Sequence, residues 1–140
     1  MFEAIGSRTV VAGEEIGQAS ALKLACNAWI GLLTAGIAQS LALAEALGVD
    51  PALFLEAIKG GAVDAPYAQL KGAAMLAGDY ATSFAVDGVR KDTGLMVEAA
   101  RGAAFPVDLL SAVLTRFDQA AELGHGADDM AAVRSAFPGS

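Results

Sequence analysis

The feature that most constrains this chain is a run without a charged residue, LACNAWIGLLTAGIAQSLALA, from Leu24 to Ala44. Alanine and leucine dominate the run, and both residues favour helix. The helical pattern extends from about Gln18 to Leu47, where Gly48 is typical of a helix C-terminus. A helix this apolar has to be buried on nearly all sides. A chain of 140 residues has little material to cover it, so we expect a second subunit to contribute.

The same run is long enough to cross a bilayer, which requires about 20 apolar residues. Polar side chains interrupt it, however, at Asn27, Thr34, Gln39 and Ser40. No cluster of lysine and arginine flanks it to set an orientation. The sequence therefore favours a buried helix of a bundle, with no membrane contact, over a membrane-spanning segment.

The rest of the chain predicts shorter helices with glycine or proline near their ends. We expect them at about Pro51–Lys59, Val86–Arg101 and Pro106–Leu123, with a short helical piece inside 62–83 and a last short helix near Asp128. One strand, RTVVAG at Arg8–Gly13, precedes them and has no partner strand in the sequence. The predicted fold is all-α, a helical bundle around one long N-terminal helix. Residues 1–17 would be a remnant strand and interdomain hinge, and residues 18–140 the helical domain.

Composition argues against several kinds of function. The net charge is −7 and no basic stripe exists, so nucleic-acid binding is not expected. One cysteine, Cys26, and one histidine, His125, exclude an internal disulfide and argue against a metal site. His125 stands between two glycines, where a helix C-cap accounts for it, and we assign it no catalytic role. The first residues lack the basic and apolar regions of a signal peptide, which favours a cytoplasmic protein.

Two polar residues inside the long apolar helix form the first candidate site. Lys23 and Asn27 lie four residues apart, so on a helix both side chains share one face. An amine tuned by burial or by nearby cations could exchange a proton with a substrate oxygen, and the amide could hold that oxygen. In the structural alternative, the lysine extends to solvent and the asparagine bonds a neighbouring helix. The spacing alone leaves both interpretations open.

The second candidate is the stretch SFAVDGVRKDTGLM, with Phe84, Lys91 and Asp92. Separations of seven and eight residues put the three on roughly one side of a helix, where a ring and a cation could meet a flat or anionic ligand. Alternatively, Ser83 caps the helix, Phe84 packs as a hydrophobic staple, and Lys91 with Asp92 is a solvated pair. This pattern alone does not decide between them either.

Taken in order, GEEIGQASALKLACN, FAVDGVRKDTGLM and GHGADDMAAV resemble the C-terminal domain of the β-hydroxyacid dehydrogenases, the 3-hydroxyisobutyrate dehydrogenase family related to 6-phosphogluconate dehydrogenase. The resemblance covers nearly the whole chain. Gly13 and Gly17 suit a hinge and do not form a GxGxxG nucleotide fingerprint. Two positions depart from the family pattern, with Ala19 in place of a second glycine and Cys26 in place of an asparagine. The resemblance implies an N-terminal Rossmann domain, which would carry GxGxxG and is not in this sequence.

The resemblance also implies roles for the first motif. Lys23 would be the catalytic acid/base, and Asn27 would position the substrate. Gly17 and Gln18 would belong to the substrate-binding segment. The substrate would be a small 3-hydroxy acid or semialdehyde.

The second motif would serve the cofactor. By the resemblance, Lys91 would contact NAD or NADP, and Phe84 and Asp92 would shape the site. Because the family dimerises through this half, a homodimer is expected. The implied function is the substrate-binding and dimerisation half of an NAD(P)-dependent dehydrogenase, inactive alone. The alternative is a helical homodimeric interaction module without catalytic activity.

Overall fold

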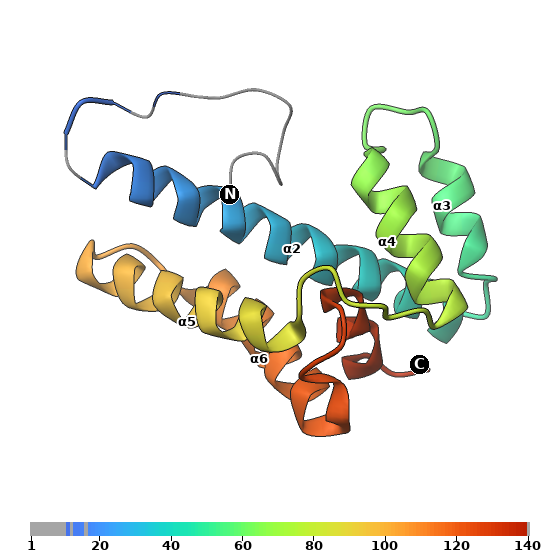
Figure 1. Ribbon diagram of the computed structural model, residues 1–140. Coiled ribbons are helices and arrows are strands. Elements are labelled where there is room, and N and C mark those ends of the chain that lie inside the picture. Colours follow the sequence, from blue (N-terminus) through green and yellow to red (C-terminus); the bar gives the residue numbers. More distant parts are fainter. Residues whose placement is uncertain (1–10, 12, 16, 140) are drawn as a thin grey trace.

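The computed structural model describes residues 11, 13–15 and 17–139 (Figure 1). Helices and no named strand make up this part of the chain, which confirms the all-α prediction. In chain order the elements are α2 (Gln18–Ala46), α3 (Ala52–Ile58), α4 (Pro66–Ala77), α5 (Val86–Gly102), α6 (Asp108–Ala120), the π-helical turn η1 (Ala121–His125) and the 3₁₀ helix η2 (Met130–Ala136). The strand expected at Arg8–Gly13 falls mostly outside the described residues.

The long helix α2 is unbroken, as predicted. Gly31 and Gly36 stay helical within it, and Gly48 beyond its end has a left-handed φ of +80°, which favours glycine. The expected burial on nearly all sides holds for only half of the helix. Buried residues begin at Gly31 and continue to Ala42, whereas the earlier turns are exposed or half-buried. The first half of α2 therefore presents an open, largely apolar surface.

By length and composition, α2 could also cross a membrane. Its second half instead packs inside the protein, and Ala38 and Leu41 are fully buried there. The second half of α2 is therefore part of the core of this bundle.

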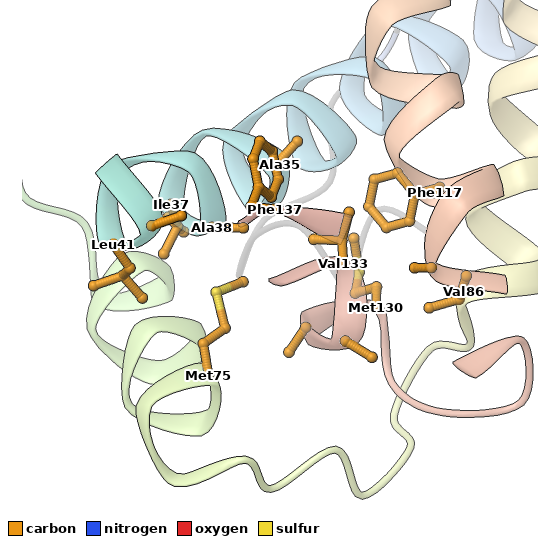
Figure 2. Close-up of a cluster of buried hydrophobic side chains, with 14 of the residues drawn as sticks. Ala35, Ile37, Ala38, Leu41, Met75, Val86, Phe117, Met130, Val133 and Phe137 are labelled. Atoms are coloured by element: carbon orange, nitrogen blue, oxygen red, sulfur yellow. The ribbon is translucent and has the colours of Figure 1, made fainter. Parts of the chain in front are cut away.

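The core forms where α2, α4 and α6 meet the closing segment η2. The hairpins α3–α4 and α5–α6 pack against α2 toward its opposite ends (Figure 1). The segment η2 contacts α2, α4, α5 and α6. Figure 2 shows Met130 and Val133 of η2 between Phe117 of α6 and the Ala35–Ala38 stretch of α2. Because Val133 and Phe117 are completely buried, this last short helix is the centre of the core.

The end of α6 differs from the sequence prediction. In place of one helix over Pro106–Leu123, α-helical geometry spans Asp108–Ala120. A π-helical turn follows, and Gly124 leaves helical geometry with a φ of +98°. This turn reverses the chain and brings η2 back beneath α2 (Figure 1). Gly124 thus follows directly after the predicted end at Leu123, and the difference from the prediction is the change from α-helical to π-helical geometry at Ala121.

We expect Phe117→Ala to be among the most destabilising substitutions in the core. Removing a fully buried ring loses its transfer free energy and leaves a cavity, which costs about 3–5 kcal/mol in the free energy of unfolding. Urea denaturation followed by circular dichroism measures the loss. Leu123→Ala, at an exposed leucine in the following turn, is the control and should stay within about 0.5 kcal/mol of wild type. Equal effects of the two substitutions would contradict the placement of the core.

Candidate functional site

The first motif lies at the exposed start of α2. Gly17 is its N-cap and has a left-handed φ of +96°. The Gln18 side chain turns back and accepts a hydrogen bond from the Glu15 amide at 3.2 Å, so it holds the segment that leads into the helix. Lys23 is exposed, and Asn27, one turn later on the same face, is half-buried. Within the described part of the chain, neither Lys23 nor Asn27 has a side-chain hydrogen bond or ion pair.

The exposure of Lys23 changes the physical argument made from the sequence. Its apolar neighbours along α2 suggest a desolvated amine, but the described residues leave the ammonium in solvent. Any desolvation of Lys23 must therefore come from a further domain, a further subunit or a bound ligand. Asn27 and Lys23 are both open to such a partner.

The helices α2 and α5 run antiparallel, and a contact between Gly31 and Val89 shows how they are aligned (Figure 1). A Cβ built on Gly31 would lie 4.0 Å from Cγ1 of Val89. Gly31 and Val89 therefore lie at the same height along the two helices. Asn27 lies one turn before Gly31 in α2. Because α5 runs in the opposite direction, Lys91 lies toward the same end, so Asn27 and Lys91 differ in height by less than about one helical turn. The two side chains do not face each other. Lys91 follows Val89 by two residues, which puts it on roughly the opposite side of α5, and its side chain is exposed. Asp92, the next residue, is half-buried nearer to α2.

Phe84 is placed differently from the prediction. The helix α5 begins at Val86, so Phe84 precedes it and does not share a helix side with Lys91 and Asp92. The Phe84 ring is 46% exposed and lies against Gly88. A Cβ on Gly88 would sit 3.1 Å from the ring atoms Cε1 and Cζ. A side chain at Gly88 would displace the ring by a few tenths of an ångström, so glycine lets the ring lie this close to α5.

A buried charge network, which the sequence analysis missed, holds the turn before α5. Lys71 of α4 donates to Oδ2 of Asp129 at 2.8 Å, and both side chains are buried. Oδ2 also accepts from the Ala131 amide at 2.9 Å. Oδ1 accepts from the Ser83 amide and hydroxyl and from the Phe84 amide, at 3.1, 2.9 and 3.2 Å. One carboxylate thus joins α4, the turn before α5, and η2.

These contacts also correct the expected cap of α5. Ser83 bonds Asp129, and the actual N-cap, Ala85, offers no side-chain hydrogen bond. The only local signal for the network is the acidic pair of GADDM before a short helix, because the partner lysine is 58 residues away. Residue spacing indicates contacts between near neighbours in the sequence, so it does not reveal an ion pair between residues this far apart.

The network sets the ionisation of Asp129. Burial by itself raises the pKa of this carboxyl. The Lys71 ammonium and the amides of Ala131, Phe84 and Ser83 outweigh burial and hold the pKa of Asp129 well below its ordinary value. Asp129 is therefore charged in the folded protein far into the acid range.

His125 has structural partners in the same region. Its Nδ1 lies 2.7 Å from Oδ2 of Asp128, and its ring meets the Tyr80 ring edge-on with centroids 5.7 Å apart. Among the described residues, no group of histidine, cysteine and acidic side chains is arranged to hold a metal ion. His125 joins the end of η1 to the loop before α5.

An apolar groove of about 590 Å³ opens beside the first turns of α2. Its walls come from α2, α5, α6 and the α5–α6 turn. Trp29, Phe105 and Leu109 line it, and each leaves more than half of its surface exposed. Small residues such as Ala28 and Ala100 also line it. The start of α2 therefore carries a polar pair on one face and an unfilled apolar groove on another.

Comparison with known proteins places these features in context. The family model described as "NAD-binding of NADP-dependent 3-hydroxyisobutyrate dehydrogenase" matches residues 17–136. L-threonate dehydrogenase of Cupriavidus necator is 32% identical over 139 residues, and glyoxylate/succinic semialdehyde reductase 2 of Arabidopsis thaliana is 30% identical over 119 residues. The crystal structure of a 3-hydroxyisobutyrate dehydrogenase from Salmonella typhimurium superposes with a TM-score of 0.86 at 27% identity.

These matches cover much of this chain but only part of each relative. They span 99% of this chain and 47% of the threonate dehydrogenase, and 85% of this chain and 33% of the plant reductase. The superposition with the Salmonella structure covers 96% of this chain and 47% of that one. The chain thus matches between a third and about half of the length of these proteins.

We expect Asp129→Asn to lower the free energy of unfolding by about 3–5 kcal/mol at pH 7, because it leaves the Lys71 ammonium buried without its anion. The pKa of Asp129 is lower in the folded state than in the unfolded state, where it is about 3.9. Its stabilising contribution is therefore complete above about pH 5 and is lost as the pH falls below about 4.

Urea denaturation at pH 7, 4 and 2.5 should show wild type and Asp129→Asn converging at the acid end. Asp118→Asn is the matched control, since Asp118 pairs with Arg90 at 2.7 Å on a partly exposed surface. It should cost less than about 1 kcal/mol. A constant difference between wild type and Asp129→Asn at all three pH values would contradict the assignment.

Proposed function

The chain belongs to the family of the NAD-binding region of NADP-dependent 3-hydroxyisobutyrate dehydrogenase, and from this membership we propose that it is the helical half of a β-hydroxyacid dehydrogenase. In this proposal it binds the substrate, a small 3-hydroxy acid or semialdehyde, and forms the dimer. A Rossmann domain would supply most of the cofactor contacts. The 140-residue chain alone would bind NAD(P) weakly or not at all and would not turn over substrate. The observation that carries the proposal is the pair of the exposed Lys23 and the half-buried Asn27 at the start of α2, within the segment that matches the family.

In the proposed site, Lys23 handles a proton and Asn27 orients the substrate. Their side chains lie one turn apart on one helix face and have no partner within the described residues. The Asn27 amide can donate to a substrate oxygen, the Lys23 ammonium can give a proton to that oxygen, and in the reverse direction the neutral Lys23 amine can take that proton back. A bound nicotinamide supplies or accepts the hydride. Gly17 and Gln18 set where α2 begins and hence where Lys23 stands.

The second motif suits a nicotinamide cofactor. Phe84 is half exposed and its ring lies against Gly88 of α5, and the exposed Lys91 forms no ion pair within the described part of the chain. A ring of this kind can contact a planar group, and a free ammonium can meet a phosphate or carboxamide oxygen. Asp92 would complete the wall between the two motifs.

The alternative is a homodimeric helical module without chemistry. The open groove beside α2 favours dimerisation in either case, because a large exposed apolar surface marks an interaction site. The two functions differ in what they require of Lys23. A dehydrogenase needs its proton, whereas an interaction module does not.

We expect Lys23→Ala to lower kcat at least about a hundredfold in a two-domain enzyme built by joining this chain to a Rossmann domain of the family. A positioned general acid or base typically contributes 10²–10⁴-fold. Lys91→Ala should mainly raise the KM for the cofactor, because Lys91 would act in binding. Steady-state kinetics measures both, with circular dichroism as a check of the fold.

Lys59→Ala, at an exposed lysine of the α3–α4 hairpin, is the matched control and should leave both constants unchanged. A kcat near the wild-type value for Lys23→Ala would refute the catalytic assignment. Lys23 would then be a solvent-exposed lysine of the first turns of α2, and the interaction module would be the better description.

We expect the chain to be a homodimer in solution through the groove and the neighbouring face of α2. Light scattering at micromolar concentration should give twice the monomer mass. The reason is the exposed apolar surface of the groove and α2, since obligate interfaces are largely apolar and bury more than about 2,000 Å². Leu109→Glu, in the groove, should shift the mass toward the monomer. Leu123→Glu, at a similarly exposed leucine outside the groove, should not. A monomeric wild-type chain would contradict the prediction.

A further inference from the structure

We propose that Asp129 is a positioning residue for Phe84: its carboxylate fixes the Phe84 backbone, and Gly88 leaves the space in which the ring rests on α5. The role of Phe84 toward a cofactor rests on the proposed function. The geometry that holds Phe84 does not depend on it.

Both backbone groups of Phe84 are bound by the closing segment. Its amide donates to Oδ1 of Asp129 at 3.2 Å, and its carbonyl oxygen accepts from the Met130 amide at 2.8 Å. The preceding amide, of Ser83, donates to the same carboxylate oxygen. The position of Phe84 is therefore set by residues about 45 positions later in the chain.

The first turn of α5 depends on the same segment. Its N-cap offers no side-chain hydrogen bond. The amides of Val86 and Asp87 instead donate to the carbonyl oxygens of Asp128 and Gly126, at 2.9 Å each. These donors at a helix start need acceptors, and here the acceptors flank Asp129. Asp129 and its neighbours cannot move relative to the start of α5 without breaking the ion pair between Asp129 and the buried Lys71.

Gly88 affects the position of the Phe84 ring, whereas Asp129 and Met130 hold the Phe84 backbone. A Cβ at Gly88 would lie 3.1 Å from two ring atoms, closer than an ordinary carbon–carbon contact of about 3.5–4.0 Å. Gly94, also in α5, has open space around its Cβ position. An alanine therefore fits at Gly94, but at Gly88 it has to push the Phe84 ring away. The two glycines are a matched pair of sites in one helix.

The first measurement needs no cofactor and uses the 140-residue chain. Amide hydrogen exchange is followed in wild type, Asp129→Asn and the control Asp118→Asn. In Asp129→Asn we expect the amides of Phe84, Val86 and Met130 to exchange at least tenfold faster, with a much smaller change at Leu41 in the core. Equal acceleration at all these amides, or none, would overturn the proposal.

A second pair of variants keeps the test decisive if Asp129→Asn does not fold. Ser83→Ala removes the hydroxyl's hydrogen bond to Asp129 and the one that it accepts from Lys71 at 3.4 Å, but it leaves the Lys71–Asp129 ion pair in place. It should still speed exchange at the Phe84 amide several-fold. Gly88→Ala should shift the Phe84 ring ¹³C resonances, whereas Gly94→Ala should not. Unchanged Phe84 exchange in Ser83→Ala together with unchanged ring resonances in Gly88→Ala would overturn the proposal.

The second measurement links this geometry to the cofactor. NADPH is titrated against the same variants in the two-domain enzyme that joins this chain to a Rossmann domain of the family, because that domain would supply most of the cofactor contacts. We expect Asp129→Asn and Gly88→Ala to weaken binding at least fivefold relative to Asp118→Asn and Gly94→Ala. Equal affinities would show that holding Phe84 does not serve the cofactor and would overturn that part of the inference. If NADPH leaves the wild-type Phe84 and Lys91 resonances unchanged, the cofactor assignment of the proposed function fails, and the first measurement still decides whether Asp129 positions Phe84.

Discussion

The buried ion pair between Lys71 and Asp129 is the contact on which the arrangement of this domain depends. Hydrophobic burial is non-directional and tolerates small displacements of one helix over another. A buried carboxylate has no such tolerance, because an unpaired charge away from water is costly. With Lys71 on one side and the amides of Ser83, Phe84 and Ala131 on the others, Asp129 fixes the register of three segments at once.

This fixed register places the short helix η2 at the centre of the packing between the longer helices. Most residues of η2 are small, and Ala131, Ala132 and Val133 are completely buried between the longer helices. Small side chains let α2, α4 and α6 approach this segment closely, and the ring of Phe117 fills the remaining space (Figure 2). The carbonyl oxygens just before η2 also accept from the first amides of α5. The last described residues of the chain therefore complete both the core and the start of a helix 40 residues earlier.

The long helix α2 divides the molecule into a stable end and an open end. Its second half is buried against η2 and α4, and its first half carries Lys23, Asn27 and one wall of the apolar groove. A rigid helix anchored at one end holds the residues at its other end in a defined place, as a binding site requires. The same division explains how so apolar a segment can belong to a chain this small. The uncovered half is the part that the proposed partner subunit and Rossmann domain would meet.

The sequence by itself determined those features that depend on neighbours along the chain. The uncharged run and Gly48 predicted one continuous helix, and the spacing of Lys23 and Asn27 placed them on one face of it, because helix geometry is local. The order of the motifs also indicated the family that the matches bear out. Only the tertiary structure decided that Phe84 precedes α5, that Lys91 and Asn27 share a level but not a side, and that Asp129 rather than Ser83 organises the turn. Those features arise from contacts between residues tens of positions apart, and local periodicity does not specify which residues pair. The two members of the buried ion pair are 58 residues apart, so only the folded chain brings them together.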